Sequence, residues 1–296
     1  MARKRGQAVI CHEPVSRRSW SPGRWPGAAG ATLLAALVFA GCAATIRPPA
    51  PAATQPAAAG LTRLTEALSR RDQEIESMRT SAVMEYRGGG RDLKAREEIA
   101  MRRPASLRVE ALAPFGVALV VAARDGHLQI FEPSKNTLMN GTATAATLDR
   151  FARIPMAPRD AVRLLMGIAP PLSNSSPPVS VTTVDGMLVA TYREANGNER
   201  DLGFEGGELV LVRERLAGGE LNYEVRYHDY HDIGGVMFPY EVEADFPLAK
   251  SHVKFNYSRP IINGNLPDSL FVLTPGPGAK RIDIGMAQGG RSVCDG

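Results

Sequence analysis

Segment 227–232 holds the side chains best suited to bind a metal ion, because His228, Asp229, His231 and Asp232 follow one another closely. Imidazole and carboxylate groups are common ligands of divalent metals. The residues before them alternate between apolar and polar, which predicts a β-strand. Successive strand residues point to opposite faces, so His228 and His231 would not converge on one ion. We interpret the segment as the polar end of a strand and predict no metal site.

Other residues capable of chemistry are isolated in a similar way. Glu97 and Glu98 are neighbours in a predicted strand, so they face opposite sides and form a poor acid–base pair. His127 follows a turn and His252 begins a strand, so both are expected at the surface. The sequence contains neither a Gly-x-Ser-x-Gly motif nor a phosphate-binding loop. We predict a protein that is not an enzyme and needs no cofactor.

Cys42 offers chemistry of another kind, because it ends an apolar stretch that follows a basic segment. Residues 31–41 are apolar or small, and Arg17, Arg18 and Arg24 precede them. This layout is typical of a secretory signal. A membrane-spanning helix is the alternative, but it needs about 20 apolar residues, more than this stretch provides.

The placement of Cys42 after Phe39-Ala40-Gly41 resembles the lipobox of bacterial lipoprotein signals. The resemblance implies that the thiol receives a diacylglycerol, that the signal peptide 1–41 is removed, and that acyl chains such as palmitate are added to the new N-terminus. An ordinary secretory signal is the alternative. Ala43 follows where inner-membrane lipoproteins of enteric bacteria carry Asp, which favours the outer membrane, facing the periplasm.

The charge of the remaining chain argues against a nucleic-acid partner. The whole sequence carries a net charge of +4, but residues 1–41 hold six of its 35 Lys and Arg and one of its 31 Asp and Glu. The rest therefore has 29 basic and 30 acidic residues, a net charge of about −1. Of the three cysteines, Cys294 would be the one left free, so no intrachain disulfide is expected.

Two segments lead from the predicted anchor to the folded domain. Residues 42–60 are rich in proline and alanine, which predicts an extended tether. Residues 61–79 predict an amphipathic helix, with Leu64, Leu68, Ile75 and Met78 on one stripe and polar residues such as Arg71 around the rest.

Most of the chain that follows alternates apolar and polar residues with a period of two. Clear examples are 107–111, 221–228, 240–246 and 253–258. Such alternation predicts antiparallel strands with one dry and one wet face. Asp125-Gly126, Asp185-Gly186 and Gly218-Gly219 are hairpin signals. We predict about 10 or 11 strands from these patterns.

Two short helices, at 145–154 and 158–166, interrupt the strands. Pro158 suits a first helical turn and Gly167 a helix end. Because a large sheet tends to curl, we predict that 61–296 is a mainly β (α+β) domain. Its architecture is an open, incomplete antiparallel barrel with an N-terminal helix and a helical lid, about 145–167. Its apolar interior could be a cavity or be filled.

Several segments, in this order, resemble the LolA/LolB superfamily of periplasmic lipoprotein carriers and receptors, and in particular its lipid-anchored LolB-like branch. The insert 144–167 resembles the family's helix, proline-containing link and second helix that ends in Leu-Leu-x-Gly. Segment 107–116 resembles the strand that ends in Pro-Leu-Gly in LolB. Segments 238–242, 253–257 and 266–273 resemble the closing strands of the superfamily.

The resemblance implies an incomplete barrel whose hydrophobic cavity holds the acyl chains of lipoproteins. Phe115 matches the position of a protruding apolar residue that helps LolB to deliver cargo to the membrane. The alternative for Phe115 is an aromatic residue tucked into the local core. The implied partners are acylated lipoproteins or lipids, a LolA-like carrier, and the membrane reached through the lipid anchor. We expect a monomer.

The candidate cavity residues occupy the apolar positions of the strands and of the two lid helices. They are Leu107, Val109, Leu119, Leu128, Ile130, Leu148, Phe151, Leu164, Leu165, Tyr223, Val225, Val242, Phe246 and Phe255. Ordinary core packing is the alternative for each of them. Two other functions stay open: binding of another lipid or glycolipid of the cell envelope, and a structural accessory role with a filled barrel.

Overall fold

The computed structural model describes residues 55–172 and 177–284 of the chain. All described residues belong to one compact unit, which lies within Pro51–Gly296. The predicted signal peptide 1–41, Cys42, Cys294 and most of the predicted tether 42–60 lie outside the described residues. The lipid anchor therefore stays a prediction.

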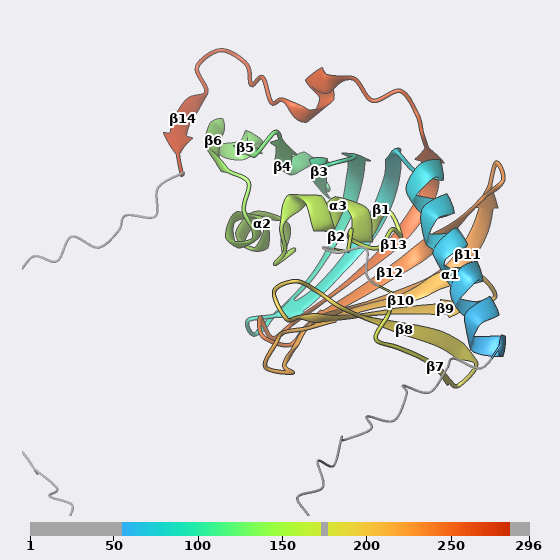
Figure 1. The fold of residues 1–296 in the computed structure, drawn as a ribbon. Helices are drawn as coiled ribbons and strands as arrows, with labels where there is room; N and C mark the ends of the chain where they lie inside the picture. The colour runs from blue at the N-terminus through green and yellow to red at the C-terminus, as the bar shows by residue number, and fades with distance from the viewer. Residues whose placement is uncertain (1–54, 173–176, 285–296) are drawn as a thin grey trace, which may run out of the picture. The chain divides into compact units, whose positions relative to one another are not determined.

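One sheet of 14 strands accounts for most of the described residues (Figure 1). The strands are β1 (Ser77–Gly88), β2 (Arg91–Arg102), β3 (Ser106–Ala113), β4 (Gly116–Arg124), β5 (His127–Glu132), β6 (Thr137–Thr142), β7 (Ser180–Val184), β8 (Met187–Arg193), β9 (Glu199–Glu205), β10 (Glu208–Arg215), β11 (Leu221–Ile233), β12 (Val236–Phe246), β13 (Ser251–Ile262) and β14 (Lys280–Asp283). Short 3-10 helices, η1 and η2, cover Pro133–Lys135 and Asp268–Phe271.

The order of the strands leaves the sheet open. It runs β14-β6-β5-β4-β3-β2-β1-β13-β12-β11-β10-β9-β8-β7, so β14 and β7 are its two edges. Every neighbouring pair is antiparallel except β14 with β6. The prediction of a mainly β, open and largely antiparallel sheet is confirmed.

The prediction of 10 or 11 strands is too low, because β1, β6 and β14 lack a clear hydropathy alternation. In β1 the buried positions include Thr80 and Ala82, whereas Val83 lies on the other face and is only partly buried. In β6 only the first two residues, Thr137 and Leu138, are buried. All four residues of β14 are exposed, so this strand has no dry face for a pattern to report.

Helix α1 (Gln55–Glu74) begins within the predicted tether and ends before the predicted end at 79. Ile75 and Met78 are fully buried as predicted for the apolar stripe, but they lie beyond the helix, and Met78 belongs to β1. The placement of Arg71 among the surface residues is wrong. Residues three or four apart share a helix face, so Arg71 lies on the face of Leu64 and is 5% exposed.

Helices α2 (Ala145–Ala152) and α3 (Pro158–Leu165) lie within one or two residues of their predicted positions. Thr144 and Thr147 cap α2 reciprocally, since each hydroxyl accepts a hydrogen bond from the other residue's N–H, at 3.2 and 2.8 Å. Pro158 occupies the first turn of α3, and Gly167 follows its end with a φ of 70°. Local signals therefore determine both helices.

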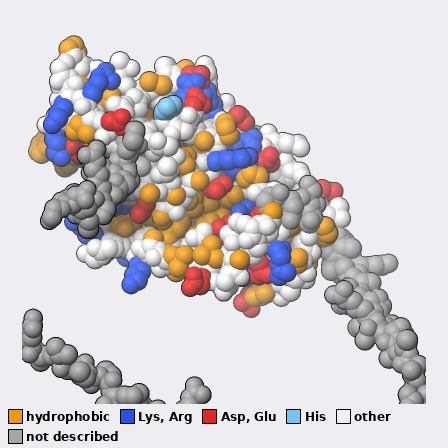
Figure 2. Space-filling view, turned by 60° about the vertical axis from the view of Figure 1, so that its left-hand side comes forward, with side chains coloured by type: hydrophobic (Ala, Val, Ile, Leu, Met, Phe, Trp, Pro, Cys, Tyr) orange, Lys and Arg blue, Asp and Glu red, His pale blue; other side chains and the backbone are white. Residues whose placement is uncertain are grey.

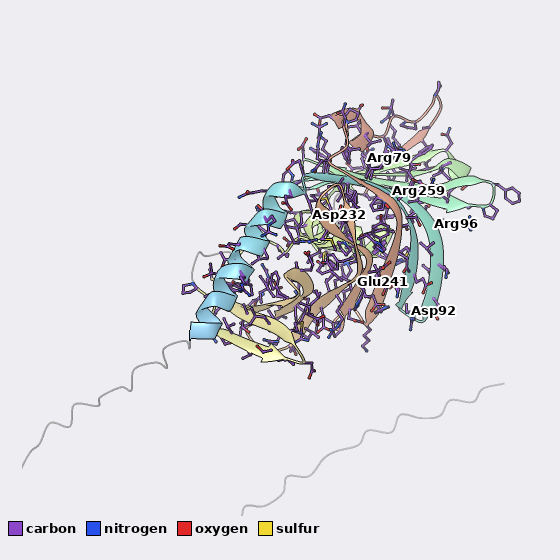
Figure 3. The ribbon with its side chains drawn as sticks, turned by 90° about the vertical axis from the view of Figure 1, so that its right-hand side faces the viewer. Arg79, Asp92, Arg96, Asp232, Glu241 and Arg259 are labelled. Atoms are coloured by element: carbon purple, nitrogen blue, oxygen red, sulfur yellow. The ribbon has the colours of Figure 1, made fainter. Side chains whose placement is uncertain are left out.

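The two faces of the curved sheet differ in character. Along β12, for example, Val242, Ala244 and Phe246 are buried, whereas Glu241 and Asp245 are not. Figure 3 shows labelled charged residues of β1, β2 and β12, such as Arg79, Arg96 and Glu241, along the sheet away from α1. No helix among the described residues is long and apolar enough to cross a membrane.

Candidate functional site

The inner face of the sheet and helices α1, α2 and α3 share one large apolar cluster. All fourteen predicted cavity residues belong to it or pack against it. Twelve are buried, namely Leu107, Val109, Leu128, Ile130, Leu148, Leu164, Leu165, Tyr223, Val225, Val242, Phe246 and Phe255, and two, Leu119 and Phe151, are partly buried. The structure thus brings together residues that lie up to about 150 positions apart.

Helix α3 is attached to the cluster by both apolar and polar contacts. Leu164 and Leu165 are buried, and the Tyr257 hydroxyl donates a hydrogen bond to the Leu165 carbonyl at 2.8 Å. Tyr257 lies on β13 between Phe238 and Phe255, with ring centroids 6.2 and 6.3 Å away. This aromatic row gives the helix a rigid surface to rest on.

A small cavity with an entirely apolar lining lies between α3 and the sheet. Its wall consists of Ile154, Met156, Leu164, Leu165, Val225, Val242, Ala244, Phe246, Val253 and Phe255. Its volume is about 20 Å³, whereas pockets for small ligands usually measure about 300–1,000 Å³. This cavity is too small for an acyl chain, which could enter it only if α3 or the link before it moved.

Phe115 lies at the turn between β3 and β4, and its side chain is completely exposed. The alternative of an aromatic residue tucked into the core is therefore wrong. Gly116 follows it with a φ of 124°, a conformation that favours glycine. Residues 111–123 contain no charged side chain, and Leu112 beside the turn is also exposed. Apolar side chains also gather across one face of the molecule in Figure 2.

The segment first considered for metal binding contributes one residue, His228, to a group of described side chains whose ligand atoms lie within 4.8 Å of one another, and the other two are Glu241 and Glu243 of β12. His231 contacts Asp229 and the Tyr240 ring instead. The ammonium of Lys254 lies 2.8 Å from Glu241 and 2.9 Å from Glu243, so both carboxylates already take part in ion pairs.

Glu97 is a polar residue in the interior, and its burial was not among the sequence-based predictions. It lies on the inner face of β2 between Ala95 and Ile99, whereas Glu98 faces outward and accepts a hydrogen bond from Ser81 at 2.6 Å. Glu97 has no ion pair or hydrogen bond from its carboxyl group within the described part of the chain. Burial raises the pKa of Glu97 to about 7. The alternation of the strand already placed Glu97 on the apolar face.

No protein-family model matches the chain, and no curated protein is similar to it in sequence. Solved structures with a related fold include a LolA superfamily protein from Nitrosomonas europaea, which is 11% identical with a TM-score of 0.49, over 71% of this chain and 97% of that chain. A DUF1329 family protein from Desulfovibrio piger is 12% identical with a TM-score of 0.47, over 74% and 98%. Lipoprotein LppX from Mycobacterium tuberculosis is 10% identical with a TM-score of 0.30, over 72% and 99%. These are likenesses of fold alone.

Proposed function

We propose that this chain is an outer-membrane lipoprotein, anchored through Cys42, that receives acylated lipoproteins and inserts their acyl chains into the membrane. The observation that carries the proposal is the single apolar cluster that joins the inner face of an open sheet to α2 and α3. In this proposal the two helices form a lid, and the acyl chain takes the place of their buried side chains.

Acyl burial keeps the chain out of water while such a lid moves. Each buried methylene contributes about 0.8 kcal/mol, so leaving a chain of about 16 carbons in water would cost about 12 kcal/mol. Displacing α3 would break the Tyr257–Leu165 hydrogen bond and the Arg163–Asp72 ion pair, which together cost about 2 kcal/mol. The apolar surface that α3 leaves would be covered again by the acyl chain, so little of it would face water.

Phe115 would act at the second step, when cargo leaves the protein. Its full exposure in an uncharged turn allows the ring to enter the bilayer surface without desolvating a charge. In this proposal the turn between β3 and β4 orients the protein on the membrane. The anchor at Cys42 keeps the protein close to that membrane, and Cys42→Ala should release it into the soluble fraction.

The test is transfer of a fluorescent acylated lipoprotein from a LolA-type carrier to the full-length Cys42→Ala protein. Leu164→Asn, on α3 in the cavity wall, should reduce transfer at least tenfold, because a polar group would face the acyl chain. Phe151→Asn, at a partly buried position, should act similarly if Leu164→Asn fails to fold. Leu248→Asn changes an exposed leucine and serves as the matched control. Equal transfer by all folded variants would refute the proposal.

The small volume of the apolar cavity favours one competing function, a structural accessory protein with a filled barrel. Such a protein would not take up a hydrophobic dye, and its α3 would stay protected from hydrogen exchange when lipoprotein is added. The proposed receptor should lose protection in α3 during transfer. Lipids that co-purify with the protein would identify a third possibility, a carrier for another envelope lipid or glycolipid.

A further inference from the structure

A second and much larger pocket lies between α1 and α3, away from the small apolar cavity. Its volume is about 640 Å³. Four arginines line it, Arg71 from α1, Arg103 from the turn after β2, and Arg159 and Arg163 from α3. The carboxylate in its wall is that of Asp72. A pocket of this size could hold the head group of a lipid.

Three of the four arginines of this pocket form ion pairs, and one does not. Asp72 is shared, since Arg103 lies 3.2 Å from its Oδ1 and Arg163 contacts the same atom. Glu76 pairs with Arg103 at 3.0 Å and Glu208 with Arg71 at 2.8 Å. Arg159 is exposed and forms no ion pair with any described residue. The Asp160 carboxylate also lies near Arg159 and Arg163, so four carboxylates surround the four guanidinium groups, but Arg159 forms an ion pair with none of them.

Backbone carbonyls hold three of these arginines in place. Arg71 Nε donates to the Gly167 carbonyl and Arg163 Nε to the Ala169 carbonyl, both at 2.8 Å. Arg103 Nη2 donates to the Asp72 carbonyl at 2.7 Å. A positioned guanidinium is well suited to bind phosphate or carboxylate with two hydrogen bonds. Because their geometry is already set, an anion would lose little binding free energy in ordering them.

Two buried donors next to the pocket lack an acceptor. Arg71 Nη2 and Arg103 Nε are inaccessible to water and have no hydrogen-bond partner in the described part of the chain. A Cβ at position 167 would lie 2.8 Å from Arg71 Nη2 and 3.0 Å from the Pro239 ring, so Gly167 lets this guanidinium pack closely against the backbone. Each of the two guanidinium groups therefore has a donor in reserve, which a ligand would reach once the side chain turned toward the pocket.

Part of the remaining wall of the pocket is apolar and continues into the main cluster. Leu68, Ile168 and Leu202 line the pocket, and Ile168 and Leu202 are buried in the cluster that contains the predicted cavity residues. A ligand that suits both surfaces carries an anionic head and an apolar tail. An inorganic anion would use the arginines alone and leave the apolar wall uncovered.

We propose that this pocket binds the anionic head group of a lipid, with the tail directed along Leu68 and Leu202 toward the apolar interior. This deepens the proposed function, on which it rests, by adding a head-group specificity to acyl binding. The arginines would recognise either a phosphate or a carboxylate head group. A free phosphate ion has the same anionic group but no apolar tail. A zwitterionic lipid places a cationic group against the arginines and should bind poorly.

Isothermal titration calorimetry of the full-length Cys42→Ala protein tests the proposal. The three probes are an anionic and a zwitterionic short-chain lipid, each below its critical micelle concentration, and inorganic phosphate. Dihexanoyl-phosphatidylglycerol should bind at least tenfold more tightly than dihexanoyl-phosphatidylcholine and than inorganic phosphate. Arg159→Gln should weaken binding of the anionic lipid about fivefold, since an ion pair near 4 Å in water contributes about 1 kcal/mol. Arg87→Gln is the matched control, because Arg87 is exposed near the far end of β1 from α1. Higher salt should weaken binding of the anionic lipid but not of the zwitterionic lipid.

Each contrary outcome removes a defined part of the proposal. Equal affinity for the two lipids, or equal loss in Arg159→Gln and Arg87→Gln, would overturn the head-group site. Phosphate that binds as tightly as the anionic lipid would overturn the role of the tail. The lipoprotein-transfer assay with Leu164→Asn is independent of Arg159. If that assay fails while anionic lipid binds as expected, the receptor function is refuted and the head-group site is supported.

Discussion

Two groups of arginines in this protein differ in how their charges are matched. The first group lies on β8 to β11 and includes Glu194, the residue after β8. Its five arginines pair with five carboxylates. The arginines are Arg193, Arg200, Arg213, Arg215 and Arg226, and the acidic residues are Glu194, Glu199, Asp201, Glu214 and Glu224. In the pocket between α1 and α3, Arg71, Arg103 and Arg163 pair with Asp72, Glu76 and Glu208, but Arg159 has no ion pair with any described residue. The first group we name the matched network, and the second the arginine pocket.

The partners in the two groups also come from different places. In the matched network, partners such as Arg213 and Glu224 are opposite each other on neighbouring strands, so the hydrogen-bonded ladder already sets their distance. In the arginine pocket, Arg71 and Arg163 extend from helices to a strand, a turn and another helix. A network within one sheet in which every arginine is paired stabilises the fold, whereas a group between separate elements with an arginine left unpaired can respond to a ligand.

The largest effect should follow from breaking the matched network at its most buried arginine. Arg200 is 7% exposed, lies 3.1 Å from Glu194 and 2.7 Å from Glu214, and donates to the Pro170 and Pro171 carbonyls. Arg200→Met should lower the free energy of unfolding by about 3–5 kcal/mol, because it removes one partner of a buried ion-pair network. Urea denaturation at pH 7 measures this.

Arg193→Met is the control for that substitution. The Arg193 side chain is 62% exposed and pairs with Glu199 at 2.7 Å. An exposed pair of this kind contributes about 0–1 kcal/mol. If the two substitutions lowered the free energy of unfolding equally, burial would not distinguish the members of the network, and the comparison would fail.

A second prediction concerns Glu97, a buried carboxyl group with no counter-ion among the described residues. Burial raises its pKa from an ordinary value of 4.5 to about 7. Between these values the folded state keeps the proton and the unfolded state does not, so stability falls as pH rises from about 4.5 to about 7. The total loss in the free energy of unfolding should be about 3 kcal/mol, because a tenfold change in proton affinity corresponds to about 1.4 kcal/mol.

Denaturation of wild type and Glu97→Gln at pH 5 and pH 8 measures this loss. Glutamine cannot ionise, so the variant should lose most of the difference in stability between the two pH values. Glu98→Gln, on the outward face of the same strand, is the matched control and should keep the difference. A difference that persists unchanged in Glu97→Gln would mean that other groups cause it.

Local signals explain why much of the fold could be predicted. In β12 and β13 the inner positions are apolar and the outer ones charged or polar, so the alternation is unambiguous. Pro158 and Gly167 delimit α3 without help from the rest of the chain. β1 escaped prediction because its inner face carries Thr80 and Ala82, whose burial depends on the strands beside it.

The residues of the site could be predicted from the sequence, but the shape of the space between them could not. Alternation assigned the fourteen apolar positions to one face, yet the space between them depends on how α3 packs on β12 and β13, which lie far away in sequence. Arg71 shows the same limit. Helix periodicity places it inward, but it is tolerated there because the Glu208 carboxylate and the Met237 carbonyl, 137 and 166 positions away, accept its hydrogen bonds.

A third prediction sharpens the comparison by weakening the ion pairs of the arginine pocket. Asp72→Asn removes the carboxylate that Arg103 and Arg163 share. The Asp72 side chain is 46% exposed, so the loss in the free energy of unfolding should be about 1 kcal/mol. Binding of dihexanoyl-phosphatidylglycerol should tighten about fivefold, because two guanidinium groups are freed.

The matched network supplies the control for this third substitution. Glu199→Gln also removes a partly exposed carboxylate that contacts two arginines, Arg193 and Arg215. It should leave calorimetric binding of the anionic lipid unchanged. Weaker lipid binding by Asp72→Asn would show that Asp72 positions the arginines more than it competes with the lipid.

The smallest effect on stability is expected at Phe115, in a segment that has no charges to match. Its complete exposure means that Phe115→Glu should change the free energy of unfolding by less than about 0.5 kcal/mol. Uptake of lipoprotein from the carrier should be normal, while insertion of the cargo into liposomes should fall, since a carboxylate resists entry into the bilayer. Phe115→Leu should behave as wild type. If uptake fell together with insertion, Phe115 would act on the interior site and not at the membrane surface.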